Sequence, residues 1–403
     1  MPHMKDIMIH RHLSEVIDKQ ARQYPVVTVF GPRQAGKTTI VKSVFPSHGY
    51  VNLEDREERD LAASDPKAFF QAHPPPVILD EIQHVPELAS AVQVLVDEDR
   101  HAMGRFILTG SHQPLLAQTV SQSLAGRTAV LDLYPPTVSE LGQAAVRADT
   151  NSLILRGFMP ELWRQPGLDA NVWYRNYFRT YIERDVRRLV NVKNLILFER
   201  FVTLLAGRVG QIANLQGLSG EVGVSSTTLA EWLSILEASF LVFRLPPAFS
   251  NISKRIVRSP KIYFTEVGLV SYLLGLETSE QIGRDPLRGN LFENMVVADI
   301  LKQRTNLGKD HRLSFLRTGA GFEVDLILDA NGEKRPIEIK SAMTWHGDFA
   351  KGPLRFVSDT QGAASPTVIY DGDDLDLSSG VQARNFRSFS VDGRYDLKRS
   401  REK

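Results

Sequence analysis

Two groups of residues in this 403-residue chain have the types and spacing that phosphate chemistry requires. The first is Gly-Pro-Arg-Gln-Ala-Gly-Lys-Thr at residues 31–38, which fits the phosphate-binding pattern G-x-x-x-x-G-K-[ST] at every fixed position. The second is Asp325 with the later run Glu338-Ile339-Lys340, two carboxylates and an amine on neighbouring predicted strands. The first pattern predicts phosphate binding by backbone amides, and the second predicts metal-assisted phosphodiester chemistry.

The sequence around residues 31–38 predicts the strand, loop and helix that such a site needs. Residues 25–30 form an apolar run typical of a buried parallel strand, and residues 39–45 carry apolar side chains at helical spacing. We expect Lys37 to reach the β- and γ-phosphates and the Thr38 hydroxyl to ligate Mg²⁺. A chance glycine turn is the alternative. The nucleotide-binding set is predicted to be Gly31, Pro32, Arg33, Gln34, Ala35, Gly36, Lys37, Thr38 and Thr39.

A second buried strand, at residues 77–80, ends in Asp80 and is followed by Glu81. An aspartate at this place can hold the Mg²⁺ shell, and the following glutamate can polarise the attacking water. An apolar strand ending in Asp-Glu also arises by chance. Burying a carboxylate without a partner is costly, however, and Mg²⁺ is a natural partner.

Thr109 and Arg127 are further candidates for nucleotide hydrolysis. The Thr109 hydroxyl, near a strand end, could sense the γ-phosphate or orient water, or it could belong to an ordinary turn. Arg127 could be an arginine finger, from the same chain or a neighbouring subunit, or a surface arginine. Strands alternating with helices predict a doubly wound parallel sheet, with Lys37, Asp80 and Thr109 at the carboxyl ends of its strands.

From about residue 151 the strand rhythm stops and helical patterns follow. Residues 173–189 predict an amphipathic helix whose aromatic residues share one face, which favours core packing over base stacking. Residues 215–239 predict a helix-turn-helix, with two wing strands at 240–245 and 261–264. This unit could bind DNA or serve only for packing. The basic residues that could contact phosphates are Arg184, Arg187, Arg188, Lys254, Arg255 and Arg258.

In the last third of the chain, Glu338 and Lys340 alternate with apolar residues, so both point to one face of a strand. Asp325 lies on the preceding predicted strand, and Glu293 lies near the start of a helix upstream. Asp325 and Glu338 could hold Mg²⁺, and Lys340 could orient or deprotonate water. A strand hairpin with charges on its solvent face would have the same pattern.

Composition excludes several classes of protein. The chain contains no cysteine, which removes disulfides, thiolate zinc sites, iron–sulfur clusters and cysteine nucleophiles, and fits a reducing cytoplasm. The 48 Lys and Arg residues balance 47 Asp and Glu residues, so overall charge gives no support to nucleic-acid binding. No apolar run approaches the ~18 residues of a membrane span, and we expect no membrane contact.

Taken together, these patterns resemble a prokaryotic ATPase family with an N-terminal AAA+-like P-loop domain and a C-terminal domain of unknown function, DUF4143. The resemblance spans nearly the whole chain. It implies ATP binding with Mg²⁺, a central winged helix and a C-terminal fold like PD-(D/E)xK nucleases, without implying that the nuclease is active. The stretches that carry it are residues 31–38, 79–83, 108–111, 125–127, 261–264, 291–294, 323–325 and 337–340.

We therefore expect an α/β protein: an AAA+-like P-loop ATPase domain at residues 1–150, a helical and winged-helix region at 151–255, and an α/β restriction-endonuclease-like domain at 256–403. Three functions compete. The chain could be an ATP-regulated protein that cuts DNA, an ATP-dependent switch that only binds DNA or protein, or a regulator of a protein partner without any DNA. A homo-oligomer is compatible with each.

Overall fold

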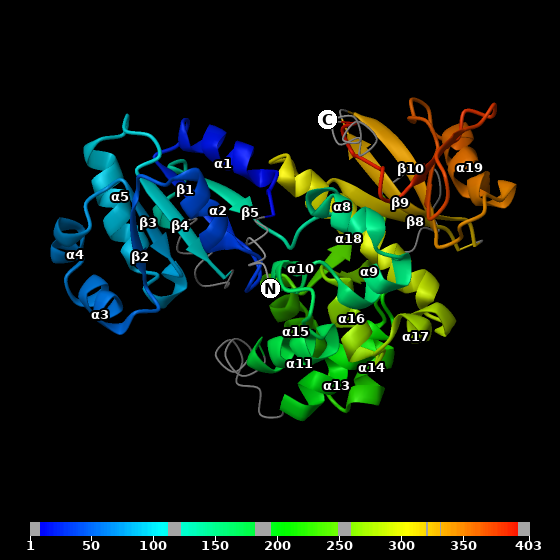
Figure 1. Ribbon diagram of the computed structural model, residues 1–403, viewed down its shortest axis with the longest axis horizontal. Coiled ribbons are helices and arrows are strands. Elements are labelled where there is room, and N and C mark those ends of the chain that lie inside the picture. The colour runs from blue at the N-terminus through cyan, green and yellow to red at the C-terminus, as the bar shows by residue number, and fades with distance from the viewer. Residues whose placement is uncertain are drawn as a thin grey trace, which may run out of the picture.

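The structure is a computed structural model that describes residues 9–111, 122–181, 195–248, 259–319, 321–330 and 332–393. Figure 1 shows an α/β part in blue and cyan, a helical part in green, and a second sheet in yellow to red. The part of the predicted helix beyond residue 181 lies outside the described residues. So do Arg184, Arg187, Arg188, Lys254, Arg255 and Arg258.

The first sheet contains five parallel strands in the order β2-β3-β4-β1-β5. Every residue of β1, β3 and β4 is buried, because helices cover both faces of the sheet. This confirms the predicted parallel P-loop sheet. The bounds are β1 Val26–Phe30, β2 Gly49–Asn52, β3 Val77–Asp80, β4 Phe106–Gly110 and β5 Thr128–Asp132.

Alternation along β1 divides the core of this part between two layers. Val27 and Val29 pack in one cluster with α1 and α2, whereas Val26 and Phe30 pack in another with α4 and α5. The helix bounds are α1 Leu13–Ala21, α2 Lys37–Val44, α3 Arg56–Ser64, α4 Pro66–Ala72 and α5 Leu88–Glu98, with a 3₁₀ turn η1 at Ile82–His84.

The charged stretch from Asp55 to Gln71 contains two helices, α3 and α4. Pro66 starts α4 because proline fits the first helical position but cannot continue a preceding helix. The Asp65 carboxylate accepts a hydrogen bond from the Ala68 amide (2.9 Å) and so caps the new helix.

Two helices and two strands of the helical part lie where the helix-turn-helix and its wing strands are predicted, and their likeness to a winged helix stays a prediction. α14 and α15 are followed by β6, which pairs with β7 in antiparallel register. Stacked rings of Trp173 and Tyr177, 5.2 Å apart, pack in the core as expected. The bounds are α7 Val138–Leu141, α8 Gln143–Arg147, α9 Thr150–Arg156, α10 Pro160–Arg164, α11 Ala170–Tyr181, α13 Leu195–Ala206, α14 Leu215–Val222, α15 Ser226–Ala238, β6 Val242–Leu245, β7 Lys261–Phe264, α16 Val267–Leu273 and α17 Ser279–Arg284.

The last part is a mixed sheet in the order β12-β13-β11-β10-β9-β8. Strands β8, β9 and β10 are antiparallel, whereas β11 joins β10 in parallel after α19. This confirms an α/β third part, and its likeness to restriction endonucleases stays a prediction. The bounds are α18 Arg288–Asn306, β8 Leu313–Arg317, β9 Glu323–Ala330, β10 Glu333–Lys340, η3 Gly347–Ala350, α19 Lys351–Asp359, β11 Thr367–Tyr370, β12 Leu375–Asp376 and β13 Gln382–Asn385.

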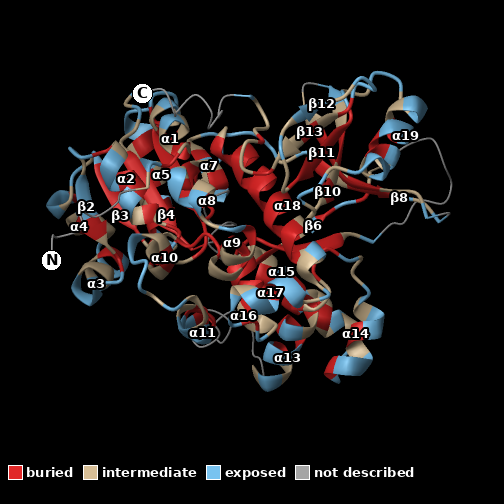
Figure 2. Cartoon of the chain, turned by 45° about the vertical axis from the view of Figure 1, so that its right-hand side comes forward, coloured by how far each residue is buried: buried red, intermediate tan, exposed pale blue. Residues whose placement is uncertain are grey.

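Helix α18 lies at the centre of the molecule. Figure 2 shows it red along most of its length, and all of residues 291–306 except Glu293 are buried. A helix that is apolar or buried all round needs protein on every side, and α18 has packing contacts with α1, α9, α16, β7 and β10. Within the described ranges, no helix is both long and apolar enough to cross a membrane.

Candidate functional site

The predicted phosphate loop connects the end of β1 to the start of α2. A Cβ atom on Gly31 would lie 2.1 Å from the Leu133 carbonyl oxygen, so only glycine fits where the loop leaves the sheet. Gly36 has a φ of 96° and precedes the first residue of α2, Lys37. The Lys37 ammonium donates to the Gly31 and Pro32 carbonyls (3.0 Å each) and therefore lies against the loop.

The buried Asp80 carboxylate, at the end of β3, receives hydrogen bonds from three side-chain hydroxyls. Thr38 Oγ1 and Tyr50 Oη each donate to Asp80 Oδ2 over 2.8 Å. Thr109 Oγ1 donates to Asp80 Oδ1 and also accepts a weak hydrogen bond from the Glu81 amide (3.4 Å). The result is a compact group of oxygen ligands beside the phosphate loop, which suits a hard cation such as Mg²⁺.

Glu81 follows β3 in a left-handed backbone conformation, with a φ of 58°. Its Oε2 accepts a hydrogen bond from Gln83 Nε2, which fixes the carboxylate from one side. Sequence reasoning missed both Tyr50 and Gln83. The sequence does place Gln83 two residues after Glu81, but nothing in it marks the Tyr50 hydroxyl as a partner of Asp80.

A cavity of about 580 Å³ opens over this loop. The residues of the predicted nucleotide-binding set that line it are those from Gln34 to Thr39, and Glu81 lines it as well. Its other walls come from segments that sequence reasoning did not connect with the loop: the chain before and within α1, and α10. Those lining residues are Ile9, His10, Arg11, Ser14, Pro160, Glu161 and Arg164.

The structure does not bring Arg127 to this cavity. Arg127 precedes β5 and lies at the amino end of the parallel strands, whereas the phosphate loop follows their carboxyl end. A five-residue strand spans roughly 17 Å. The Arg127 guanidinium donates to both carboxylate oxygens of Asp97 (2.9 and 2.8 Å). The prediction of an arginine finger acting within the same chain is therefore wrong, and a role toward a neighbouring subunit stays a prediction.

The four residues predicted in the last third of the chain come together at one end of β9, β10 and α18. Lys340 Nζ lies 2.6 Å from Glu338 Oε1 and 3.9 Å from Asp325 Oδ2, which also accepts a hydrogen bond from the Ile339 amide (2.9 Å). Burial, and then the nearby Asp325 carboxylate, raises the pKa of both Glu293 and Glu338 to about 7.

Two further residues join this acidic cluster from β7. Glu293 Oε1 accepts hydrogen bonds from Tyr263 Oη and Lys261 Nζ (3.3 Å), and Lys261 Nζ also lies 2.9 Å from Glu323 Oε1. Lys261 and Tyr263 alternate on their strand, so the period of two could have placed them on one face. In the described part of the chain, no three His, Cys, Asp or Glu side chains are arranged to hold a metal ion. The Mg²⁺ site at Asp325 and Glu338 stays a prediction.

The parallel sheet, the glycine loop and the Thr38–Asp80 pair define a P-loop ATPase. Family models agree: an "AAA domain" matches residues 23–142, a "Domain of unknown function (DUF8612)" matches 147–280, and a "Domain of unknown function (DUF4143)" matches 288–388. The expected ATPase family with a DUF4143 domain is confirmed. The predicted domain boundaries at 150 and 255 stay a prediction.

The chain belongs to the same family as two mycobacterial proteins. It is 33% identical over 323 residues to "Uncharacterized protein Rv2008c" of Mycobacterium tuberculosis (strain ATCC 25618 / H37Rv), a match that covers 79% of this chain and 71% of that protein. The same values hold for "Uncharacterized protein Mb2031c" of Mycobacterium bovis (strain ATCC BAA-935 / AF2122/97).

Solved structures with some similarity include the Walker-type ATPase PABY2304 of Pyrococcus abyssi, at 14% identity and a TM-score of 0.44. The match covers 66% of this chain and 96% of that one. The ORC1 protein of Aeropyrum pernix, solved in complex with DNA, is 15% identical with a TM-score of 0.30, over 68% of this chain and 94% of that one.

Proposed function

We propose that the chain binds ATP with Mg²⁺ at the phosphate loop and that Glu81 acts as the base for hydrolysis. The observation that carries this proposal is the convergence of Thr38, Tyr50 and Thr109 on Asp80 beside the loop. This all-oxygen donor set fits Mg²⁺, which would be held through Thr38 and Asp80 and would supply charge neutralisation on the phosphates.

The remaining residues bind and orient the substrate. The loop amides and Lys37 bind phosphate oxygens, and Glu81, held by Gln83, accepts a proton from the attacking water. Thr109 keeps Asp80 and the Glu81 backbone in place, since its hydroxyl is already engaged with both. Arg164, which lines the cavity from α10, brings a positive charge to the phosphates.

The test is ATP turnover and ATP affinity of purified protein. Lys37→Ala is expected to remove measurable ATP binding. Glu81→Gln is expected to lower kcat by roughly 10²–10⁴-fold while ATP affinity changes only a few-fold, because a general base acts mainly in the transition state.

Exposed residues of the same types on neighbouring elements, Lys19→Ala and Glu87→Gln, are the matched controls and should behave as wild type. If Glu81→Gln turns over ATP at the wild-type rate, Glu81 is not the base. If Lys37→Ala binds ATP with wild-type affinity, the phosphate loop is not the ATP site.

A second candidate function is nucleic-acid cleavage by the last part of the chain. The observation that favours it is the meeting of Glu293, Asp325, Glu338 and Lys340 from separate segments of the sequence. In this candidate, Lys340 orients water while the carboxylates hold Mg²⁺. The helix-turn-helix of α14 and α15 would then contact the same DNA.

Cleavage of single- and double-stranded DNA with Mg²⁺ or Mn²⁺, with and without ATP, tests this candidate. Cutting should be lost in Lys340→Ala and retained in Lys334→Ala, a lysine earlier on the same strand. Salt-dependent DNA binding without cutting would favour an ATP-dependent switch. Absence of DNA binding at low salt, with a protein recovered in pull-downs, would favour the regulator of a protein partner.

A further inference from the structure

A single buried arginine, Arg11, ties the phosphate loop to the rest of the molecule, and the proposed chemistry does not use it. Its guanidinium donates to the Ala35 carbonyl (2.9 Å), to the Tyr134 carbonyl (2.6 Å) and to Glu140 Oε1 (3.2 Å). One planar group thus joins the loop, the chain after β5 and the short helix α7.

The contact with Ala35 bears on phosphate binding directly. In a trans peptide the carbonyl oxygen and the following amide hydrogen point in opposite directions. By holding the Ala35 carbonyl, Arg11 therefore also fixes the direction of the Gly36 N–H, a member of the predicted phosphate-binding set. Ala35, Gly36 and Arg11 all line the same cavity.

Glu140 is the next member of the chain of contacts and is itself held on several sides. It accepts hydrogen bonds from the His12 and Thr137 amides (2.8 Å each) and closes the capping box of α7. Burial opposes its charge, but Arg11, His12 and these backbone donors together hold the pKa of Glu140 below its ordinary value. The Glu140 carboxylate therefore stays charged and has hydrogen-bond partners on both of its oxygens.

From α7 the contacts continue to the central helix α18. The Val138 amide donates to Asp299 Oδ1 (2.7 Å), and Gln303 Nε2 donates to Asp299 Oδ2 (2.7 Å). Gln303 in turn bonds the Phe389 carbonyl (3.2 Å) and the Val391 amide (3.0 Å) near the end of the described chain. Asp299 and Gln303 are at most 6% exposed, so solvent does not compete for these bonds.

We propose that Arg11 is a positioning residue of the ATPase and that the chain Arg11–Glu140–α7–Asp299 couples nucleotide binding at the loop to helix α18. This inference rests on the proposed ATP binding. Helix α18 also carries Glu293 of the acidic cluster, so nucleotide at the first site would bias the geometry of the second.

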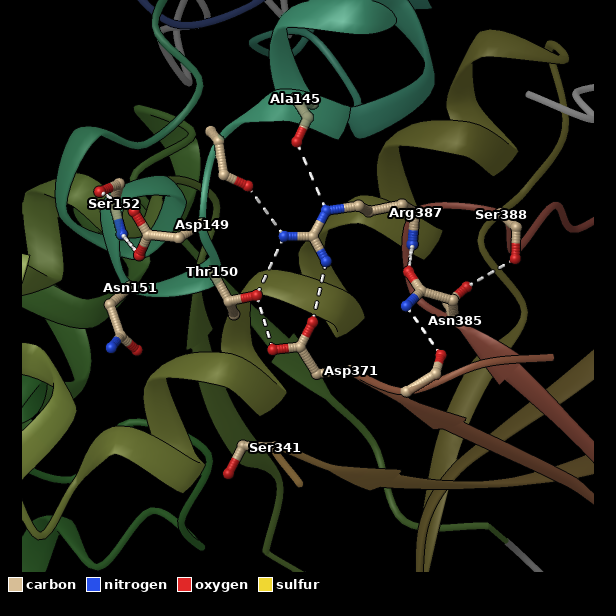
Figure 3. Close-up of polar contacts among 12 residues, drawn as sticks. Ala145, Asp149, Thr150, Asn151, Ser152, Ser341, Asp371, Asn385, Arg387 and Ser388 are labelled. Carbon is tan, nitrogen blue, oxygen red and sulfur yellow. Dashed lines mark hydrogen bonds and ion pairs between the residues drawn. The ribbon is translucent and has the colours of Figure 1, made fainter. Parts of the chain in front are cut away.

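The structure offers a matched control for this proposal in Arg387. Figure 3 shows its guanidinium among the Ala145 carbonyl, Thr150 and Asp371; it also donates to the Ala148 carbonyl. This clamp joins the helical part to the last part of the chain, as the Asp299 contact does, but these four partners all lie outside the loop and α7. If the variants acted only by a general loss of stability, Arg387→Gln and Asp299→Asn would have the same effect.

The experiment is hydrogen–deuterium exchange of α18 peptides with and without ATPγS and Mg²⁺, together with ATPγS affinity by calorimetry. Five proteins are compared: wild type, Arg11→Lys, Asp299→Asn, Arg387→Gln and the double variant Arg11→Lys/Asp299→Asn. Lysine keeps the charge at position 11 but cannot reach all three acceptors. Asparagine keeps the shape at position 299 but weakens one of its two hydrogen bonds.

We expect ATPγS to slow exchange in α18 of the wild type and of Arg387→Gln, and to leave it unchanged in the other three variants. Asp299 does not line the cavity over the phosphate loop. Asp299→Asn should nevertheless weaken ATPγS binding about three- to tenfold, and this effect should vanish when Arg11→Lys is also present. Additive effects in the double variant, or equal behaviour of Asp299→Asn and Arg387→Gln, would overturn the coupling. If the wild type does not bind ATPγS at all, the proposed ATP site itself is wrong.

Discussion

Asp80 depends on Tyr50 for part of its orientation, and this can be tested at the level of one hydroxyl group. Burial, with the hydrogen bond to Asp80, raises the pKa of Tyr50, so its hydroxyl remains a proton donor. The Lys42 ammonium lies over the face of the Tyr50 ring, 3.2 Å from its centre, as in a cation–π contact.

Tyr50→Phe is expected to raise the Mg²⁺ concentration needed for half-maximal ATPase activity by roughly three- to tenfold, because Asp80 loses one of its three hydroxyl donors. The maximal rate at saturating Mg²⁺ should change less than about twofold. Steady-state ATPase assays over a Mg²⁺ series measure both values, with Tyr24→Phe as the control. An unchanged Mg²⁺ dependence would show that Tyr50 does not position the carboxylate.

The sequence predicted the residues of this candidate site that lie at or just after the carboxyl ends of strands, because parallel strands bring these ends to one edge. Lys37, Asp80 and Thr109 were found in this way. Arg11 and Arg164 could not be, since Arg11 lies just before α1 and Arg164 ends α10, and the position of both relative to the loop is set by tertiary packing. The ion pair of Arg127 with Asp97 could not be predicted either, because an ion pair at the surface leaves no pattern in the sequence.

At the scale of elements, the junction of α18 with β10 brings two glutamates of raised pKa into one place. The ordinary glutamate pKa is 4.5, whereas Glu293 and Glu338 have values of about 7 in the folded chain. Between these values the native protein binds more protons than the unfolded chain. The free energy of unfolding should therefore fall as the pH rises from about 4.5 to 7, and this contribution should then level off.

Glu338→Gln removes one of these groups and should flatten that fall. Thermal unfolding between pH 5 and 8 in EDTA measures this: the variant should gain stability relative to wild type as the pH rises. Glu333→Gln, an exposed glutamate on the same strand, should run parallel to wild type. A constant difference between Glu338→Gln and wild type across this range would contradict the raised pKa.

Helix boundaries could be predicted where one local signal, such as a cap or turn residue, decided them. They could not be predicted where two local signals competed. The turn between α14 and α15 was found because Gly223 ends one helix and Ser225 caps the next, accepting a hydrogen bond from the Thr228 amide (3.1 Å). The break at Pro66 lies where helix-forming residues on both sides compete with a proline that cannot continue the preceding helix. Strand pairing in the last sheet depends on non-local contacts that no local pattern specifies.

At the scale of the whole molecule, the cavity over the phosphate loop, where we propose that ATP binds, has walls from both the AAA part and α10 of the helical part. A ligand that fills it contacts both and binds only the folded chain. ATP with Mg²⁺ should therefore raise the free energy of unfolding, by about 2.7 kcal/mol at a ligand concentration 100 times Kd.

Differential scanning calorimetry with increasing ATP measures this stabilisation, and the transition should move as one unit if the two parts unfold together. Lys37→Ala should lose the shift. GTP at the same concentration reports base selectivity. A transition that splits, with only one component responding to ATP, would show that α10 does not share the bound nucleotide.

The Arg387 clamp also limits how the parts of this chain can move. The guanidinium bonds the carbonyls of Ala145 and Ala148 and the hydroxyl of Thr150, which lie along the short connection from α8 to α9. Such a connection would ordinarily be the natural hinge between an ATPase domain and the next domain of the chain. Here it is bonded to the last sheet through Arg387 and Asp371, and these bonds oppose bending at the connection. A bending motion driven by ATP must therefore pivot outside residues 143–156, or first release Arg387.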